Sequence, residues 1–345
     1  MIDLRSDTVT RPTEKMKDFM MKAKLGDDVF GEDPTVNELQ KYMAELAGKE
    51  ASLFVPSGTM ANQLAIGTLS GPGDELLCHS SYHIYQWEGG APARLWGVTT
   101  RALENSNGIL DVEDFQDKVR PIDSHYARTR VISLENTLNR KGGCVYPLDK
   151  IKKIAFWART KGLKMHLDGA RLFNASVATD ISIKEWAKYF DTISICFSKG
   201  LGTPLGSILL GSEESIEKAH TLRKFMGGGM RQSGIVAAAA LYAVKNNVER
   251  LKVDHQNAKA LANEINEIKG LDLEFPEIET NIVWIKVDPE KAKAPELLER
   301  LKEKGVLMTG GPGNLIRACT HLDVNKPDIG KVSQILKDIL ASDFK

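Results

Sequence analysis

Short apolar runs alternate with helix-like patterns between about residue 34 and residue 240. In residues 34–48 apolar side chains recur at three- and four-residue steps, with Pro in the first turn and Gly at the end, which predicts a helix. Residues 51–55 form an apolar run short enough for a buried strand, and residues 56–59 turn into a second helix that reaches residue 69. This alternation favours an α/β protein with a mainly parallel, doubly wound sheet.

The same criteria predict the remaining elements of this region: strands at 75–78, 130–135, 163–167, 192–197 and 207–210, and helices at 149–161 and 181–190. Beyond residue 229 the pattern changes to a long helical stretch at 234–268, followed by strands near 271–275, 281–287 and 315–319 and helices at 295–304 and 328–340. We therefore expect a large domain at 13–245 and a small C-terminal α+β domain at 246–345.

The composition suits two domains around sizeable cores, since the 345 residues are 42% hydrophobic. The chain has 46 basic and 46 acidic residues, so it has no general attraction to nucleic acid or to an anionic membrane. Its longest apolar run, residues 235–244, is far shorter than the roughly 20 residues of a membrane helix. Acidic residues at positions 3 and 7, with no apolar segment, are unlike a signal peptide. A cytoplasmic protein is expected.

The cysteines and histidines give little sign of a metal. Four cysteines are far apart in the sequence and none forms a C-x-x-C pair, which is typical of reduced thiols: Cys78, Cys144, Cys196 and Cys319. His79 and His83 are four residues apart, but Ser80 follows the first, so no H-E-x-x-H motif is present. Whether a metal binds is left unknown.

Reactive side chains follow four of the predicted strands. Ligands of an open α/β sheet bind beyond the carboxyl ends of its strands. There the chain carries an acid, an amine, a hydroxyl–glycine turn and a histidine: Asp168, Lys199, Ser57-Gly58-Thr59 and His83. Each alone has an ordinary structural explanation, such as a helix cap, a solvated lysine or a structural histidine. The combination is what points to chemistry.

One cofactor, pyridoxal 5'-phosphate, needs all of these groups at once. It requires a lysine for its Schiff base and a carboxylate that keeps its pyridine nitrogen protonated. Its phosphate suits the amino end of a helix with Ser and Thr hydroxyls, and a flat side chain commonly stacks on its ring. Nucleotide cofactors fit less well, because no G-x-G-x-x-G opens the first strand–helix unit and no G-x-x-x-x-G-K-[ST] occurs.

Seven motifs closely resemble those of the low-specificity L-threonine aldolases, which are pyridoxal-phosphate enzymes. They lie at residues 4–10, 26–29, 31–34, 56–60, 166–171, 198–200 and 227–232, in the family's order, and the resemblance runs from residue 2 to about 321. It implies the aspartate-aminotransferase-like fold (fold type I), with a seven-stranded sheet in the large domain. It also implies a homotetramer, built as a dimer of dimers.

The resemblance further implies a role for each matching residue. Lys199 would carry the cofactor, Asp168 would pair with the pyridine nitrogen, and His83 would stack on the ring. Ser57, Gly58 and Thr59 would hold the phosphate, and Arg231 would reach the phosphate of a neighbouring subunit. Ser6, Arg171 and Arg317 would bind the substrate carboxylate, with Arg171 also beside the cofactor. His125 would be a second active-site histidine. Ser6 can take part only if residues 1–12 fold over the active site.

The implied reaction cleaves L-threonine and L-allo-threonine to glycine and acetaldehyde, with low stereospecificity at the β-carbon. It would pass through an external aldimine and a quinonoid, with His83, His125 or a water held by both as the base that takes the β-hydroxyl proton. The same residues would also serve a β-eliminating lyase or an aminotransferase on this fold. A non-catalytic binding protein is disfavoured, because Lys199 is present.

Two positions depart from the family pattern. The chain has Phe30 where the family often has Tyr, and Leu138 where it often has His. If either position reaches the substrate's β-substituent, the preference for aldehyde or diastereomer differs in this protein. By analogy a cation can bind near Thr8 or Thr10, although no ligand spacing demands one.

Overall fold

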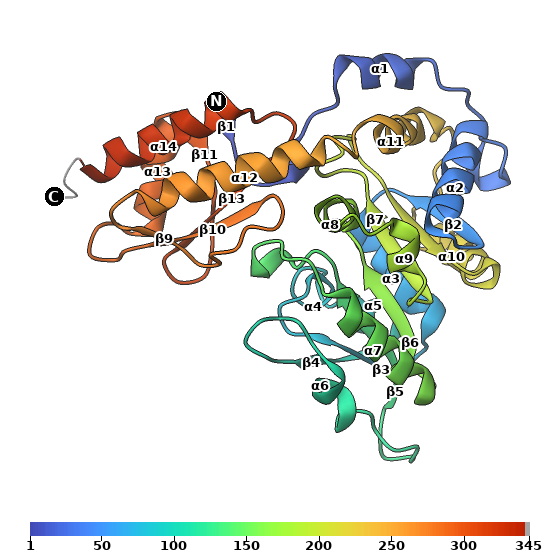
Figure 1. The fold of residues 1–345 in the computed structure, drawn as a ribbon. Coiled ribbons are helices and arrows are strands. Elements are labelled where there is room, and N and C mark those ends of the chain that lie inside the picture. The colour runs from blue at the N-terminus through green and yellow to red at the C-terminus, as the bar shows by residue number, and fades with distance from the viewer. Residues whose placement is uncertain (342–345) are drawn as a thin grey trace.

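The computed structural model describes residues 1–341, and a seven-stranded sheet lies at the centre of its larger unit (Figure 1). Its strands run in the order β2 (Ala51–Val55), β8 (Ser207–Gly211), β7 (Thr192–Cys196), β6 (Lys164–Asp168), β5 (Arg128–Glu135), β3 (Asp74–His79) and β4 (Thr99–Leu103). Only β8 is antiparallel to its neighbours; the other adjacent pairs are parallel. The predicted mainly parallel sheet is confirmed.

Helices pack on this sheet and on one another. They are α1 (Glu14–Met21), α2 (Pro34–Ala47), α3 (Gly58–Leu69), α4 (His83–Gln86), α5 (Ala91–Trp96), α6 (Val112–Gln116), α7 (Leu148–Thr160), α8 (Leu172–Thr179), α9 (Ile183–Ala187), α10 (Glu213–Phe225) and α11 (Gly234–Asn246). Helix α2 begins where the Asp33 carboxylate accepts from the backbone N–H groups of Thr35 and Val36. It ends at Gly48, whose φ of 62° favours glycine.

A second, smaller unit lies beside the first and has its own hydrophobic core. Its four-stranded antiparallel sheet has the order β12 (Thr309–Gly310), β13 (Leu315–Cys319), β10 (Ile282–Val287) and β9 (Leu271–Leu273), packed with α12 (Leu251–Asn266), α13 (Ala294–Glu303) and α14 (Lys326–Ala341). The buried cluster changes between Leu251 and Ala258, inside α12. The boundary at residue 245 stays a prediction, although α11 and α12 are separated at residues 247–250.

The N-terminal segment connects the two units. Strand β1 (Ile2–Asp3) pairs in parallel with β11 (Val306–Leu307), and Leu4 is fully buried in the core of the smaller unit. A few residues later Asp7 forms an ion pair of 2.7 Å with Arg171, which precedes α8 of the larger unit. Residues 1–12 therefore cross from one unit to the other.

Some elements differ from those predicted. The helix predicted at 181–190 is only the short α9, which begins after its N-cap Ser182 and ends at its C-cap Lys188. Strand β4 was not predicted, since its half-exposed Thr-Thr-Arg-Ala-Leu sequence lacks a continuous apolar run. None of the helices within residues 1–341 combines the length and the apolar character needed to cross a membrane.

Candidate active site

A cavity of about 610 Å³ lies at the carboxyl ends of β5, β6 and β7. The N-terminal segment and the small sheet close its other sides. Nine of the residues predicted from sequence line it: Ser6, Ser57, Gly58, Thr59, His83, Asp168, Arg171, Lys199 and Arg317. Segments from both ends of the chain therefore meet in one place, as a site for a cofactor and a substrate requires.

The amino end of α3 provides the anion-binding part of the cavity. Ser57 caps the helix and accepts a hydrogen bond from the Met60 backbone N–H at 3.2 Å. The next two N–H groups, of Gly58 and Thr59, have no backbone or side-chain acceptor among the described residues. A Cβ at Gly58 would lie 2.6 Å from Cys196 Sγ, so only glycine fits there. Free N–H groups at a helix amino end suit a phosphate.

Asp168 ends strand β6, and its side chain is almost fully buried. One carboxylate oxygen accepts from Asn62 Nδ2 at 2.8 Å and the other from the Ala170 backbone N–H at 3.1 Å. Asn62 Oδ1 is held in turn by Ser194 Oγ at 2.6 Å and by His166 Nε2 at 3.1 Å. Burial lowers the pKa of His166 to about 4, so at neutral pH this ring is uncharged and its Nε2–H donates to Asn62. The fixed carboxylate suits a pyridinium nitrogen.

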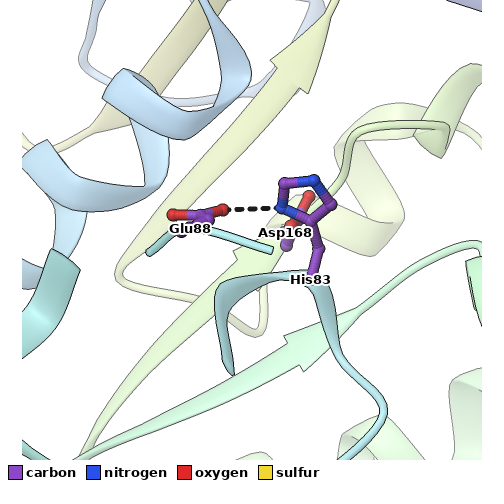
Figure 2. A group of neighbouring side chains, drawn as sticks. All are labelled: His83, Glu88 and Asp168. Carbon is purple, nitrogen blue, oxygen red and sulfur yellow. Dashed lines mark hydrogen bonds and ion pairs between the residues drawn. The ribbon is translucent and has the colours of Figure 1, made fainter. Parts of the chain in front are cut away.

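Figure 2 shows His83, Glu88 and Asp168 side by side. The Glu88 carboxylate is fully buried and accepts from His83 Nδ1 at 2.8 Å. It also accepts from Asn62 Nδ2 at 2.8 Å and from Gln63 Nε2 at 2.6 Å. Because a carboxylate accepts at Nδ1, the Nδ1 atom carries the proton and Nε2 is the free nitrogen of the ring.

The charge of this cluster sets the protonation of His83. Burial lowers the pKa of the ring, but the hydrogen bond to Glu88 and the charges of Asp168 and Glu88 outweigh burial, so the pKa is raised. The three side chains are close enough to share a metal ion. However, the oxygens of both carboxylates already accept hydrogen bonds from Asn62, Gln63 and Ala170, which favours a hydrogen-bonded network.

Glu135 is a cavity residue that the sequence interpretation missed. It ends β5 as Asp168 ends β6, so the strand-end criterion itself could have found it. Its two oxygens accept from the backbone N–H groups of His83, at 2.6 Å, and Asn139, at 2.9 Å. Burial, reinforced by the charge of Asp168, raises the pKa of Glu135 well above its usual range. It fixes the backbone that carries the histidine.

Two arginines, Arg171 and Arg317, also line the cavity. Arg171 donates Nε and Nη2 to the two oxygens of Asp7, both at 2.7 Å. This pair lowers the pKa of buried Asp7 far below its usual range, against the effect of burial. Arg317 donates to Asn139 Oδ1 at 3.1 Å and to the Arg5 carbonyl at 2.9 Å, while its buried Nε has no hydrogen-bond partner among residues 1–341. Arg317 therefore retains a donor for a carboxylate.

Lys199 and Ser6 complete the set. Lys199 lies in the turn after β7, where its side chain lines the cavity. The positive charge of Lys199 is among the influences that lower the pKa of Asp7, and Lys199 and Arg171 line the same cavity. Ser6 accepts from Thr8 Oγ1 at 2.9 Å, and both side chains line the cavity.

His125 and Arg231 are not brought into the cavity of their own chain. His125 is exposed, bonds to Asp123 at 2.6 Å and precedes the amino end of β5, whereas the cavity lies at the carboxyl end of that strand. Arg231 forms an ion pair with Asp27 at 2.9 Å on the surface. Both roles stay predictions that require a second copy of the chain.

The two departures from the family pattern also lie outside this cavity. Leu138 is buried in the core of the large unit, although its neighbours Thr137 and Asn139 line the cavity. Phe30 is largely exposed and lies beneath the Arg231 guanidinium, 5.8 Å from the ring centroid. Within one chain neither position contacts the substrate region.

Known proteins match the chain over nearly its full length. Residues 3–288 match a family model described as beta-eliminating lyase. The low specificity L-threonine aldolase of Escherichia coli strain K12 is 44% identical over 342 residues, which covers 99% of this chain and 100% of that protein. The low-specificity L-threonine aldolase 1 of Arabidopsis thaliana is 40% identical over 333 residues, which covers 95% of this chain and 93% of that protein. The solved threonine aldolase of Leishmania major shares the fold, with a TM-score of 0.85 at 19% identity. The match covers 99% of this chain and 100% of that one.

Proposed function

Since the chain belongs to the β-eliminating lyase family, with low-specificity L-threonine aldolases as its close relatives, we propose how its own residues carry out their reaction. The fold is that of the aspartate-aminotransferase-like enzymes of this family. The protein is an aldehyde-lyase that cleaves L-threonine and L-allo-threonine to glycine and acetaldehyde. The observation that carries the proposal is the meeting of Lys199, Asp168, His83 and the amino end of α3 in one cavity.

The family depends on pyridoxal phosphate, and the donor set of the cavity fits that cofactor. Lys199 would hold it covalently, Asp168 would hold its pyridine nitrogen, and the free N–H groups at Gly58 and Thr59 would hold its phosphate. The ring of His83 would lie against it. When bound, the cofactor supplies an electron sink for the pair left at Cα when the Cα–Cβ bond breaks.

Substrate orientation belongs to the arginines and Asn139. Arg317 binds the α-carboxylate, and Arg171, whose charge is paired with Asp7, contributes its remaining N–H donor beside it. Asn139 Oδ1 accepts from Arg317 at 3.1 Å and from Arg171 at 3.5 Å, so it holds the two guanidiniums in one relative position. Fixing the carboxylate in this way fixes which bond at Cα can break.

His83 acts as the base for the β-hydroxyl group. Its Nδ1 is protonated by its bond to Glu88, so Nε2 is the atom that takes the hydroxyl proton while the Cα–Cβ bond breaks. His125 of a neighbouring chain is the alternative base. We also propose a cytoplasmic homotetramer, a dimer of dimers, in which Arg231 contributes to the phosphate site of the neighbouring chain.

The decisive experiment measures glycine and acetaldehyde from L-threonine with protein supplied with pyridoxal phosphate. Wild type should form both in equal amounts, and Lys199→Ala should lose at least about 10³-fold in kcat/KM. Lys161→Ala, on the exposed surface, is the matched control and should be unchanged. Pyruvate and ammonia from L-serine, without glycine from L-threonine, would indicate β-elimination instead.

A further inference from the structure

A third arginine of the cavity, Arg140, is held between two tryptophans. Its guanidinium carbon lies 4.9 Å from the ring centroid of Trp87 and 5.4 Å from that of Trp284. The three residues come from separate places, after α4, in the turn at residues 139–141 and in β10, and all of them line the cavity. Stacking on two indoles fixes a guanidinium and leaves the N–H groups in its plane free to donate.

The charge of Arg140 is not neutralised by any side chain of residues 1–341. Across residues 1–341, no carboxylate or other acceptor forms an ion pair or hydrogen bond with its guanidinium. Burial lowers the pKa of Arg140, and no nearby anion raises it again. Arg171, by contrast, is neutralised by Asp7. A partly buried guanidinium with free donors is suited to an anionic ligand.

L-Threonine has no second anionic group that could pair with Arg140. Its single carboxylate is bound by Arg317, whose guanidinium lies over the same Trp284 indole at 5.8 Å. Both guanidiniums lie over the Trp284 ring, so their charges are close, and burial together with repulsion from Arg171 and Arg140 lowers the pKa of Arg317. Trp87 directly follows α4, the helix that begins at His83, so one of the two indoles that hold Arg140 comes from the segment that carries the base proposed for the β-hydroxyl group.

We propose that this enzyme also cleaves β-hydroxy-α-amino acids whose side chain ends in a carboxylate, and that Arg140 binds that carboxylate. The proposal rests on the aldolase function above. With β-hydroxyaspartate, the β-hydroxyl loses its proton and becomes the aldehyde carbonyl of glyoxylate as the Cα–Cβ bond breaks. The electron pair stays at Cα, which gains a proton and leaves as glycine. No oxidant or reductant is consumed.

The test compares kcat/KM for L-threonine, L-β-hydroxyaspartate and L-β-hydroxynorvaline, an uncharged substrate with a longer side chain, by glycine formation. Wild type should prefer the hydroxyaspartate to the hydroxynorvaline by roughly 10-fold or more. Arg140→Gln should lower the value for hydroxyaspartate by roughly 10- to 100-fold and change that for threonine by less than about threefold. Arg140→Lys should retain part of the preference, because it keeps the charge.

Lys141→Gln is the matched control, since it removes a positive charge from the same turn. Lys141 donates to the Ser106 carbonyl at 2.9 Å and does not line the cavity, so the preference should be unchanged. A second measurement, fluorescence quenching of the tryptophans, gives dissociation constants for L-aspartate and L-alanine, which lack the β-hydroxyl and are not cleaved by this route. Arg140→Gln should weaken the binding of L-aspartate and leave the binding of L-alanine unchanged.

The outcomes separate two failures. If Arg140→Gln lowers kcat/KM equally for all three substrates, Arg140 serves their common α-carboxylate and the proposal is overturned. An unchanged preference in the variant would overturn it as well, since Arg140 then only stacks between the indoles. If wild type does not cleave L-threonine, the aldolase function itself fails, whatever happens with the dicarboxylate.

Discussion

At the scale of single residues, the chemistry depends on one amide group. Asn62 donates through the same Nδ2 atom to Glu88 and to Asp168, each at 2.8 Å. The carboxylate that would hold the pyridine nitrogen and the carboxylate that orients His83 are therefore positioned by one side chain. A buried network of this kind is rigid when every member is satisfied.

Replacing Glu88 by Gln keeps the shape of the side chain and removes its charge. Because the carboxylate raises the pKa of His83, the variant's histidine should lose its proton at lower pH. The acid limb of kcat/KM, which rises as the base form appears, should therefore move to lower pH, with roughly 10-fold lower activity at pH 8. A pH–rate profile measures both, with exposed Glu113→Gln as control. An unmoved limb would contradict the role of His83 as the base.

The residues of this network show where sequence reasoning stops. Asp168, Lys199 and His83 were predictable, because each follows an apolar strand and the strand ends of a parallel sheet converge. Glu88 was not, because it follows no strand. Its importance arises from contacts with Asn62 and Gln63, about 25 residues away in sequence, which no local pattern encodes.

At the scale of elements, the N-terminal segment is the piece that joins the two units across the cavity. Strand β1 pairs with β11 of the smaller unit. The Asp7 carboxylate accepts hydrogen bonds from Arg171 of the larger unit and, at 3.2 Å, from Asn281 of the smaller unit. Six of the seven strands of the large sheet were predicted from their apolar runs, β4 being the exception. The two-residue pairing of β1 with β11 was not, since so short a strand has no periodicity.

Asp7→Asn should loosen this segment. Removing one partner of a buried ion pair leaves Arg171 as an uncompensated buried charge, which costs about 3–5 kcal/mol of stability. Asp3→Asn, which breaks an exposed pair with Arg5, should cost less than about 1 kcal/mol. Urea unfolding measures both values, and hydrogen exchange of residues 1–12 should accelerate only in the first variant. Equal effects of the two changes would argue against a special role of Asp7.

At the scale of the whole molecule, one chain contains most of the site but not all that was predicted. His125 and Arg231 lie on the surface, at different places and away from the cavity. Neither position could be judged from sequence, because a motif match does not say whose cavity a residue serves. A second copy is the simplest way for an exposed histidine to reach an active site.

Mixing two variants, each of which is inactive if both residues are needed, tests this assembly. Lys199→Ala removes the amine from a chain's own site, and His125→Phe removes the histidine that a chain would contribute to the site of its neighbour. If sites are shared, unfolding and refolding the two together should restore about a quarter of wild-type activity, by random pairing. Each variant refolded alone is the control. No recovery in a mixture shown by mass to contain both chains would mean that His125 does not act in a neighbouring chain's site.

The pairing of β1 with β11 also has a consequence for synthesis on the ribosome. Ile2 leaves the exit tunnel among the first residues, while its partner Val306 is made about 300 residues later. At about 5–20 residues per second, the segment that carries Ser6 waits on the order of tens of seconds before it can dock. The cavity is thus among the last parts of the nascent protein to form, and a chain released before β11 lacks the strand that holds Ser6 in place.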